Sequence, residues 1–423
     1  MDKIVIKGGK KLKGEVTISG AKNAVLPIMA AALLAEGTSR IEGIPSLQDV
    51  GTMVKLLRVL GAKVNLFDHA VEINAGNGLK SIAPYHLVST MRASVCVLGP
   101  LLARLGRAEV SLPGGCVIGS RPIDLHLKGL ASLGAEITIE HGYVKARAKK
   151  GLHRADIYLG GSYGSSVLAT ANVMMAAVLA RGTTYIENAA CEPELVDLAD
   201  FLNKMGARIN GHGSHLIQIE GVDKLMGTHH SIIPDRIEAG TFMVAGAMVR
   251  GSDVTVRNCN PEHNHALLDK LKQAGVAVTK TADSVRIRRN GLLKPVEVTT
   301  LPYPGFPTDL QAQIMALATI TPGISVITEK IYPDRFIHVS ELNRMGSKVF
   351  LEGSSAIVHG VKHLSGAPVM ASDLRASAAL ILAGLAAEGK TEVHRVYHLD
   401  RGYERIEEKL SALGASIGRE KED

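Results

Sequence analysis

A chain of 423 residues is too long for one ordinary hydrophobic core and predicts two or three domains. Hydrophobic residues make up 46% and charged residues 21%, as in globular proteins, which argues against disorder and against a coiled coil. The net charge of +7 allows nucleic acid as a partner. Because the basic residues are dispersed and there is no Trp for base stacking, small anionic substrates are favoured.

The N-terminal residues 1–13 include five lysines and no apolar stretch long enough for a signal peptide, so secretion is not expected. The longest apolar runs, residues 24–35 and 376–387, have about twelve residues each, fewer than the roughly twenty that span a bilayer. They predict buried helices. The cysteines form no Cys-x-x-Cys pair, so neither zinc nor a disulfide framework is indicated and a reducing cytoplasm fits. They are Cys96, Cys116, Cys191 and Cys259.

The first part of the chain predicts one structural unit. Residues 14–19 alternate as a strand, and residues 22–36 predict an Ala- and Leu-rich helix that ends at Gly37. Residues 38–44 predict a second strand, and apolar residues at helical spacing in residues 50–57 predict an amphipathic helix. Two short strands follow, so the predicted order is β-α-β-α-β-β.

This unit is repeated six times. Each copy has one glycine that ends its first helix and a second that ends its second helix. The second glycines are 68 to 73 residues apart, at Gly61, Gly134, Gly206, Gly275, Gly346 and Gly414. Six copies leave almost no chain for an inserted domain, which favours three repeats in each of two domains. We expect a short connector around residues 225–235, where Gly, two His and Pro occur.

Polar residues recur at the start of the first helix of each repeat, 14 to 16 residues before its closing glycine. A helix N-terminus offers free N–H groups and about half a positive charge, which suits phosphate and carboxylate. Each residue taken alone is as well explained as a cap or a solvated charge, but six together predict a cleft that binds a polyanion. They are Lys22, Arg92, Ser166, Arg236, Asp309 and Arg375, with Asn23 and Asp373 beside them.

Residues 111–126, SLPGGCVIGSRPIDLH, predict a loop that can move. Three glycines and two prolines surround Cys116, and Arg121 is expected to lower the pKa of its thiol, which predicts a reactive cysteine. The other cysteines are predicted to be buried and inert. The segment 262–265 has two His and no third ligand, so a surface loop is favoured over a metal site. No dinucleotide or P-loop fingerprint is present.

Eight segments spread over the whole chain resemble those of the UDP-N-acetylglucosamine enolpyruvyl transferases. The cysteine loop is specific to this family, whereas the enolpyruvylshikimate-phosphate synthases share the repeats without this loop. The segments are SGAKNAVLP (19–27), TMRAS (90–94), LPGGCVIGSRPIDLH (112–126), ENAACEPE (187–194), PDRIEAGTF (234–242), FPTDLQAQ (306–313), DLRASAAL (373–380) and HLDRGYERIE (398–407).

The resemblance implies a two-domain inside-out α/β barrel built from six βαβαββ repeats, three per domain. One domain would comprise residues 22–232, with the catalytic cysteine loop at 112–121. The other would combine residues 1–21 with residues 233–423. The active site would lie in the cleft between them.

The resemblance also implies the reaction, the addition of the 3-hydroxyl of UDP-N-acetylglucosamine to C2 of phosphoenolpyruvate, followed by elimination of phosphate. This is the first committed step of peptidoglycan synthesis, which serves cell shape and cell division. The chemistry needs an acid, a base and a cationic cradle, and no cofactor or metal. Cys116 would donate the proton to C3, with a phospholactoyl adduct as a further role, and would be the fosfomycin target. Asp309 would be the base for the hydroxyl, with Asp373 as the second candidate.

The implied substrate ligands form two sets. Those near the phosphate or carboxylate of phosphoenolpyruvate are Lys22, Arg92, Arg121, Arg375 and Arg401. Those for the UDP-sugar are Asn23 and Asp309 at the sugar, Arg121, Pro122, Ile123, Asp124 and Leu125 at uracil and ribose, Ser166 at the diphosphate and Ile331 at the nucleotide's edge. A Ser-Val-Gly turn is common at the diphosphate in this family, and here Leu168 replaces the glycine, so only Ser166 is carried over.

Three alternatives stay open. The first is an enolpyruvyl transferase for another acceptor, such as shikimate phosphate. The second is a non-catalytic binding paralogue, against which the presence of Cys116, Asp309 and Arg401 argues. The third is a nucleic-acid enzyme of similar repeat fold, such as an RNA 3'-phosphate cyclase, which only the positive charge favours.

Overall fold

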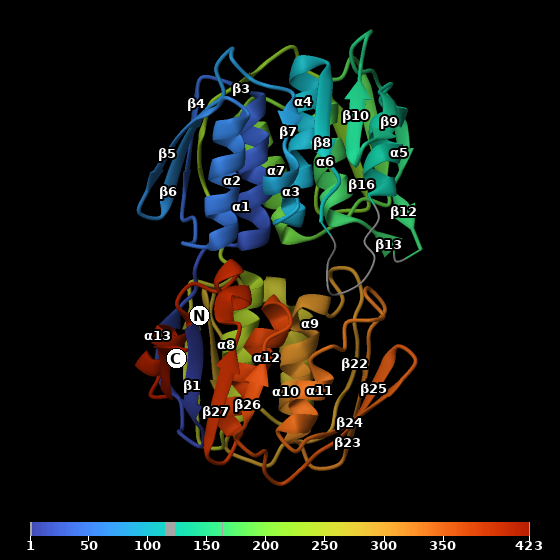
Figure 1. Cartoon of the computed structure of the whole chain (residues 1–423). Helices are drawn as coiled ribbons and strands as arrows, with labels where there is room; N and C mark the ends of the chain where they lie inside the picture. Colours follow the sequence, from blue (N-terminus) through green and yellow to red (C-terminus); the bar gives the residue numbers. More distant parts are fainter. Residues whose placement is uncertain (1, 115–122, 163, 423) are drawn as a thin grey trace. The chain divides into compact units, whose positions relative to one another are not determined.

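The structure is a computed structural model that describes residues 2–114, 123–162 and 164–422. The chain divides into two compact units (Figure 1). One unit combines Met1–Ser19 with Pro234–Asp423, and the other consists of the described residues between Gly20 and Ile233. The chain therefore passes from one unit to the other after Ser19 and again after Ile233.

Each unit contains three four-stranded sheets with the same strand order. The first strand of each sheet is parallel to the second, and the remaining pairs are antiparallel. In the unit that begins at Gly20 the sheets are β18 (His229–Ser231), β4 (Thr38–Glu42), β6 (Ala70–Asn74), β5 (Lys63–Phe67); β7 (Ile82–Ala83), β8 (Arg107–Ser111), β10 (Tyr143–Arg147), β9 (Glu136–Glu140); and β11 (Asp156–Tyr158), β14 (Thr183–Glu187), β16 (Leu216–Glu220), β15 (Arg208–Asn210).

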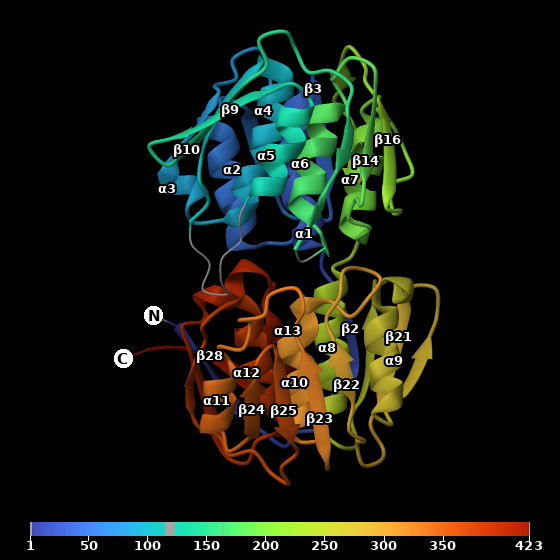
Figure 2. The same cartoon turned by 90° about the vertical axis from the view of Figure 1, so that its right-hand side faces the viewer.

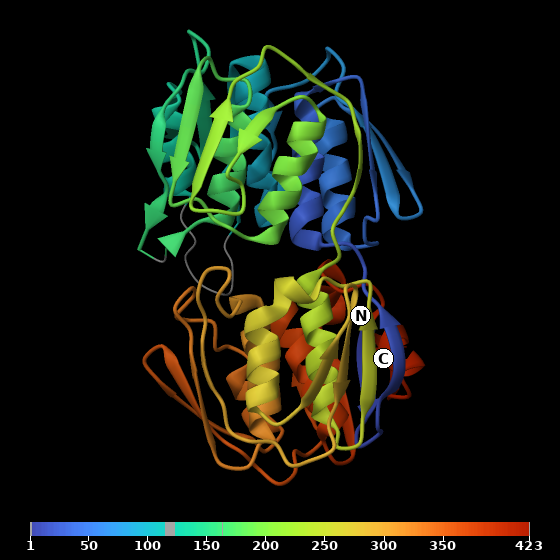
Figure 3. The same ribbon diagram turned by 180° about the vertical axis from the view of Figure 1, so that it is seen from behind.

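The other unit repeats this pattern, with one strand replaced. Its third sheet is completed by the N-terminal strand β1, which pairs with the C-terminal strand β28. The marks for the two ends of the chain accordingly lie close together in Figure 3. The sheets are β2 (Lys13–Thr17), β19 (Asp253–Arg257), β21 (Ser284–Arg288), β20 (Ala277–Lys280); β22 (Glu297–Thr299), β23 (Ile324–Thr328), β25 (Ser355–His359), β24 (Lys348–Glu352); and β26 (Pro368–Met370), β27 (Lys390–His394), β1 (Asp2–Lys7), β28 (Ser416–Lys421).

The helices of each repeat differ in burial, and this difference makes the units inside-out. The first helices are buried nearly all round: every residue of α8 (Arg236–Met248) and of α10 (Gln311–Thr319) is buried. A helix that is apolar on all sides belongs in a core, and Figures 1 and 2 show these helices enclosed by the sheets of their own unit. The remaining first helices are α1 (Lys22–Ala31), α4 (Leu98–Leu105), α6 (Val167–Ala177) and α12 (Leu374–Ala386).

The second helices are amphipathic. In α2 (Gln48–Val59), the residues Val50, Met53, Val54 and Leu57 are buried, as their spacing predicts. The equivalent helices are α5 (Asp124–Ser132), α7 (Pro193–Lys204), α9 (His265–Gln273), α11 (Val339–Arg344) and α13 (Ile406–Ala412). The short elements α3 (Tyr85–Val88), β12 (Gly160–Gly161) and β13 (Gly164–Ser165) complete the regular structure outside the 3-10 turns and β3 and β17.

The predicted first helix is too long. α1 ends at Ala31, a 3-10 turn follows, and Ala35–Glu36 form β3, which pairs in parallel with β17 (Leu225–Met226). A run of Ala and Leu that is buried on every side has no polar face to mark its end. Gly37, with φ of +90°, follows the strand rather than the helix.

One strand belongs to another sheet than the repeat pattern by itself predicts. The strand predicted at residues 14–19 is β2, and it pairs with β19 of the fourth repeat instead of joining the first. Its place in the first repeat is taken by β18, which pairs with β4. The predicted connector at residues 225–235 is therefore partly β17 and β18, and within it the chain passes from one unit to the other only after Ile233.

Glycine is required where the last strand of a repeat ends. A Cβ at Gly360 would lie 1.6 Å from the backbone oxygen of Thr321, and one at Gly221, the equivalent position two repeats earlier, 1.6 Å from that of Ala180. We expect Gly360→Ala to lower the free energy of unfolding by on the order of 3 kcal/mol, because backbone must move to admit the methyl group. Chemical denaturation measures this loss. Gly291→Ala, where nothing lies within 4 Å, should change stability far less, and equal losses would contradict the steric explanation.

Candidate functional site

The recurrent polar residues lie at the start of the buried first helix in every repeat, as their spacing predicts. In three repeats a 3-10 turn or a capping residue carries them, and in three the helix itself does. Lys22 and Arg236 begin α1 and α8, Arg375 is the second residue of α12, Ser166 caps α6, Arg92 begins the 3-10 turn Arg92–Val97 before α4, and Asp309 lies in the turn Thr308–Leu310 before α10.

Lys22 is buried and forms an ion pair with a second buried residue. Its Nζ lies 2.8 Å from Oδ2 of Asp49, near the start of α2. The side chains of the pair are 11% and 5% exposed, so the charge of each depends strongly on the other. Asn23, the next residue of α1, is half-buried. Asp49 was not among the predicted site residues, because only the fold brings the start of α2 to the start of α1.

The start of α4 is held by an amide in a buried network. Asn172 donates from Nδ2 to the backbone oxygen of Val95, and its Oδ1 accepts from the amide of Gly99. The same Nδ2 lies 3.0 Å from Nδ1 of His126. Burial, and then the charge of Arg92, lower the pKa of His126 to about 3, so this ring stays neutral near pH 7.

The other predicted residues of this unit lie at two helix starts. Ile123 is the buried capping residue of α5, Asp124 is exposed and Leu125 is half-buried. The Ser166 hydroxyl accepts from the amide of Ala169, and Leu168 lies in the first turn of α6 instead of a glycine turn. Cys116, Arg121 and Pro122 lie outside the described residues, as does most of the predicted loop 112–121.

Asp309 is held between two guanidinium groups. Its Oδ1 lies 2.9 Å from Nη1 of Arg335, and its Oδ2 lies 2.9 Å from Nη2 of Arg375. Burial by itself would raise the pKa of Asp309, but the charges of Arg375 and Arg335 and their hydrogen bonds hold it well below its usual range. Asp309 is therefore ionised at neutral pH. Burial lowers the pKa of Arg375. The charge of Asp309, followed by those of Tyr403 and Asp235, outweighs burial, so the pKa of Arg375 is raised overall.

The remaining predicted residues of this unit occupy a helix cap and two turns. Asp373 caps α12, and its Oδ1 accepts from the amides of Arg375 and Ala376. Arg401 ends the 3-10 turn Val396–Arg401 and is half-buried. Ile331 follows β23, and its amide donates to Glu329. Among the predicted residues of this unit, the structure brings Asp309 and Arg375 into direct contact.

Sequence analysis missed Arg335 and Glu329, although both lie in the same hydrogen-bonded group as Asp309. One signal for Glu329 is present, since a charged residue directly after an apolar strand of a parallel pair occupies a position where ligands are often bound. Arg335 carries no such signal, because it lies in a short charged segment that would also suit a solvated turn.

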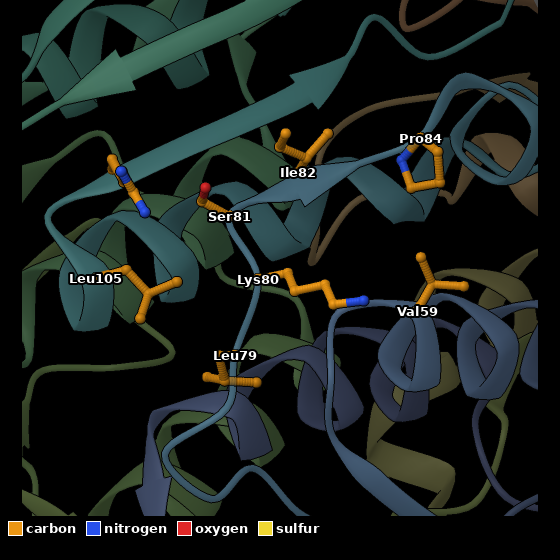
Figure 4. Close-up of a pocket in the computed structure, with 8 residues that line it drawn as sticks. Val59, Leu79, Lys80, Ser81, Ile82, Pro84 and Leu105 are labelled. Atoms are coloured by element: carbon orange, nitrogen blue, oxygen red, sulfur yellow. The ribbon is translucent and has the colours of Figure 1, made fainter.

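Two other features lie away from these residues. A surface cavity of about 650 Å³ lies between Val59, Leu79, Ile82 and Leu105, and Figure 4 shows these side chains around it. None of the predicted site residues lines it. His265 and Glu262 form an exposed ion pair, and within the described ranges no group of three or more His, Cys, Asp or Glu is arranged to hold a metal ion.

Residues 6–410 match the family model described as EPSP synthase (3-phosphoshikimate 1-carboxyvinyltransferase). The chain belongs to this family. The solved structure of the enolpyruvyl transferase NikO from Streptomyces tendae is similar with a TM-score of 0.88 and 26% identity, and covers 100% of this chain and 99% of its own. The predicted two-domain α/β repeat fold is confirmed.

Two relatives that match the whole length of the chain carry the same name. It is 56% identical to UDP-N-acetylglucosamine 1-carboxyvinyltransferase of Myxococcus xanthus (strain DK1622), over 100% of both chains. It is 55% identical to the protein of the same name from Desulfatibacillum aliphaticivorans, again over 100% of both. The resemblance found in the sequence motifs is confirmed. None of the helices in the described part of the chain has the length and apolar character needed to cross a bilayer.

Proposed function

We propose that this chain is a transferase that moves the enolpyruvyl group of phosphoenolpyruvate to the 3-hydroxyl of UDP-N-acetylglucosamine and releases phosphate. The observation that carries the proposal is the 56% identity, over the full length of both chains, to an enzyme named for this activity. The cationic helix starts add a physical reason, because both substrates are anions. The reaction would take place in the cytoplasm and begin peptidoglycan synthesis.

The proposed substrate ligands are the residues that the family resemblance implies. Lys22, Arg92, Arg121, Arg375 and Arg401 would compensate the phosphate and carboxylate of phosphoenolpyruvate. Helix N-termini add partial positive charge at Lys22 and Arg375, which strengthens such a cradle where water is excluded. The proposed contacts to the UDP-sugar are Asn23, Pro122, Ile123, Asp124, Leu125, Ser166, Asp309 and Ile331.

The proposed chemistry has two steps. In the addition, the sugar oxygen bonds to C2 while Asp309 takes the hydroxyl proton and Cys116 gives a proton to C3. In the elimination, C3 loses a proton and the C2–O bond to phosphate breaks. Asp309 meets the first requirement of a base, since Arg335 and Arg375 keep it ionised. The same two charges weaken it as a base, so Asp373 stays the second candidate.

Phosphate release from phosphoenolpyruvate tests the proposal directly. We expect release with UDP-N-acetylglucosamine and none with shikimate 3-phosphate or without an acceptor. Release with shikimate 3-phosphate but not with UDP-N-acetylglucosamine would show a different acceptor. Binding of UDP-N-acetylglucosamine without any phosphate release would instead support a non-catalytic paralogue.

A further inference from the structure

Glu329 is a carboxylate with no exposed surface, directly after β23. Its Oε1 accepts hydrogen bonds from Oγ1 of Thr300 at 2.6 Å and from the amides of Ile331 and Tyr332 at 2.8 and 3.0 Å. Its Oε2 accepts from Oγ1 of Thr308 at 2.8 Å. Burying a carboxylate is costly unless hydrogen bonds satisfy it, and these four do so.

The two oxygens of Glu329 lead to different parts of the proposed site. Oε1 holds the backbone of Ile331 and Tyr332, the segment proposed to contact the nucleotide. Oε2 leads through Thr308 towards Asp309. The guanidinium of Arg335 donates from Nη1 to Oγ1 of Thr308 at 3.0 Å and to Oδ1 of Asp309 at 2.9 Å.

The donors and acceptors between Arg335, Thr308 and Glu329 follow from the chemistry of these side chains. A guanidinium can only donate, so the hydroxyl of Thr308 accepts a hydrogen bond from Arg335 and donates one to Glu329. The side chain of Arg335 is 6% exposed, and Thr308 and Asp309 share the same Nη1. The position of this nitrogen against the Asp309 carboxylate therefore depends on the Thr308 hydroxyl.

We infer that Asp309 is positioned by a relay of two side chains that is anchored at Glu329. The relay consists of Thr308 and Arg335. Its consequence for the reaction rests on the proposed function, since that proposal assigns Asp309 as the base. A base must be held within hydrogen-bond reach of the hydroxyl whose proton it takes, and small displacements of such a group lower the rate strongly.

Three variants separate this role from mere stability. Thr308→Val keeps the shape of the side chain and breaks the relay, whereas Thr308→Ser keeps the hydroxyl. Thr300→Val is the matched control, because it removes a buried threonine hydroxyl from the same carboxylate on the side that does not lead to Asp309. Thr300 also accepts from the amide of Lys330, so its loss should cost at least as much stability.

We expect Thr308→Val to lower kcat about tenfold or more while the KM for phosphoenolpyruvate stays nearly unchanged. Thr308→Ser should retain most of kcat. Thr300→Val should lower the thermal unfolding midpoint and lower kcat much less than Thr308→Val does. Equal losses of kcat in Thr300→Val and Thr308→Val, or no loss in Thr308→Val, would overturn the inference.

A second measurement does not depend on turnover. Carbon-13 NMR titration of aspartate carboxyl groups, assigned with Asp309→Asn, should show a higher pKa for Asp309 in Thr308→Val and no change in Thr300→Val. Among the contacts of the described residues, Arg335 and Arg375 form ion pairs with this carboxylate, and the variant loosens only the first. If wild type releases no phosphate, the proposed function fails and this titration still decides the relay. An unchanged titration in Thr308→Val would exclude it.

Discussion

Lys22→Ala is expected to lower kcat/KM by a factor of about 100 or more, because the proposed contact to the phosphoenolpyruvate anion contributes on the order of 3 kcal/mol in a site closed to water. Arg401→Ala should act in the same direction. Steady-state phosphate release measures both. The Lys22 variant should lose kcat as well as apparent affinity, since charge that develops in the transition state loses its cationic partner.

The ion pair of Lys22 complicates this variant. Removing the lysine takes away the cation that lies 2.8 Å from the buried carboxylate of Asp49, and breaking a buried ion pair destabilises a fold by itself. The double variant Lys22→Ala/Asp49→Ala removes both charges. We expect its thermal unfolding midpoint to recover towards wild type while turnover stays lost. A double variant with near wild-type kcat/KM would show that Lys22 only neutralises Asp49.

The repeats are the part of the fold that could be predicted from sequence alone. Glycines at fixed spacing mark the ends of the second helices, and the apolar stripe of α2 and the buried run of α12 follow from local periodicity. Strand partners could not be predicted in the same way. Alternation shows that β2 is a strand, but its pairing with β19 depends on hydrogen bonds to residues more than 200 positions away. The repeat pattern therefore does not predict the exchange of β2 for β18, whereas the family resemblance already implied that residues 1–21 belong to the other domain.

The candidate site was predictable to the extent that it follows the repeat. Equivalent positions point in equivalent directions, so the helix-start residues could be found as a set. The contacts between them could not. Lys22 forms its ion pair with Asp49 of the same repeat, whereas Asp309 forms one with Arg375 of the next repeat. Arg335, the other partner of Asp309, lies at no position that recurs in the repeats. Such contacts depend on how the repeats pack, which local sequence does not encode.

Fosfomycin, an epoxide that carries a phosphonate, is expected to alkylate Cys116 faster than the other cysteines. Cys116 and Arg121 lie outside the described part of the chain. The prediction therefore rests on the sequence, which places Cys116 in a glycine-rich loop near Arg121. The thiolate would attack an epoxide carbon, the C–O bond would break, and the oxygen would take a proton from water. The cationic residues proposed to bind phosphoenolpyruvate would hold the phosphonate, and UDP-N-acetylglucosamine should accelerate the reaction by closing the site.

The structure makes the remaining cysteines suitable internal controls. Burial raises the pKa of the Cys96 thiol to about 12. Burial is the main cause that raises the pKa of the Cys259 thiol to about 11. A backbone hydrogen bond from Val285 lowers this pKa and the charge of Asp283 raises it, both by less than burial does. Burial and then the charge of Glu192 raise the pKa of Cys191. A thiol with a raised pKa holds little thiolate near neutral pH, so these three should react slowly.

Two variants test the role of the sulfur. Cys116→Asp keeps a group that can transfer a proton and removes the nucleophile, so it should retain some turnover and lose fosfomycin sensitivity. Cys116→Ser offers a far weaker acid and should lose most turnover over multiple cycles. Peptide mass mapping after fosfomycin treatment locates the adduct. It must lie on the peptide that contains Cys116. An adduct on Cys96, Cys191 or Cys259, or none on an active enzyme, would refute the assignment of Cys116 as the reactive thiol.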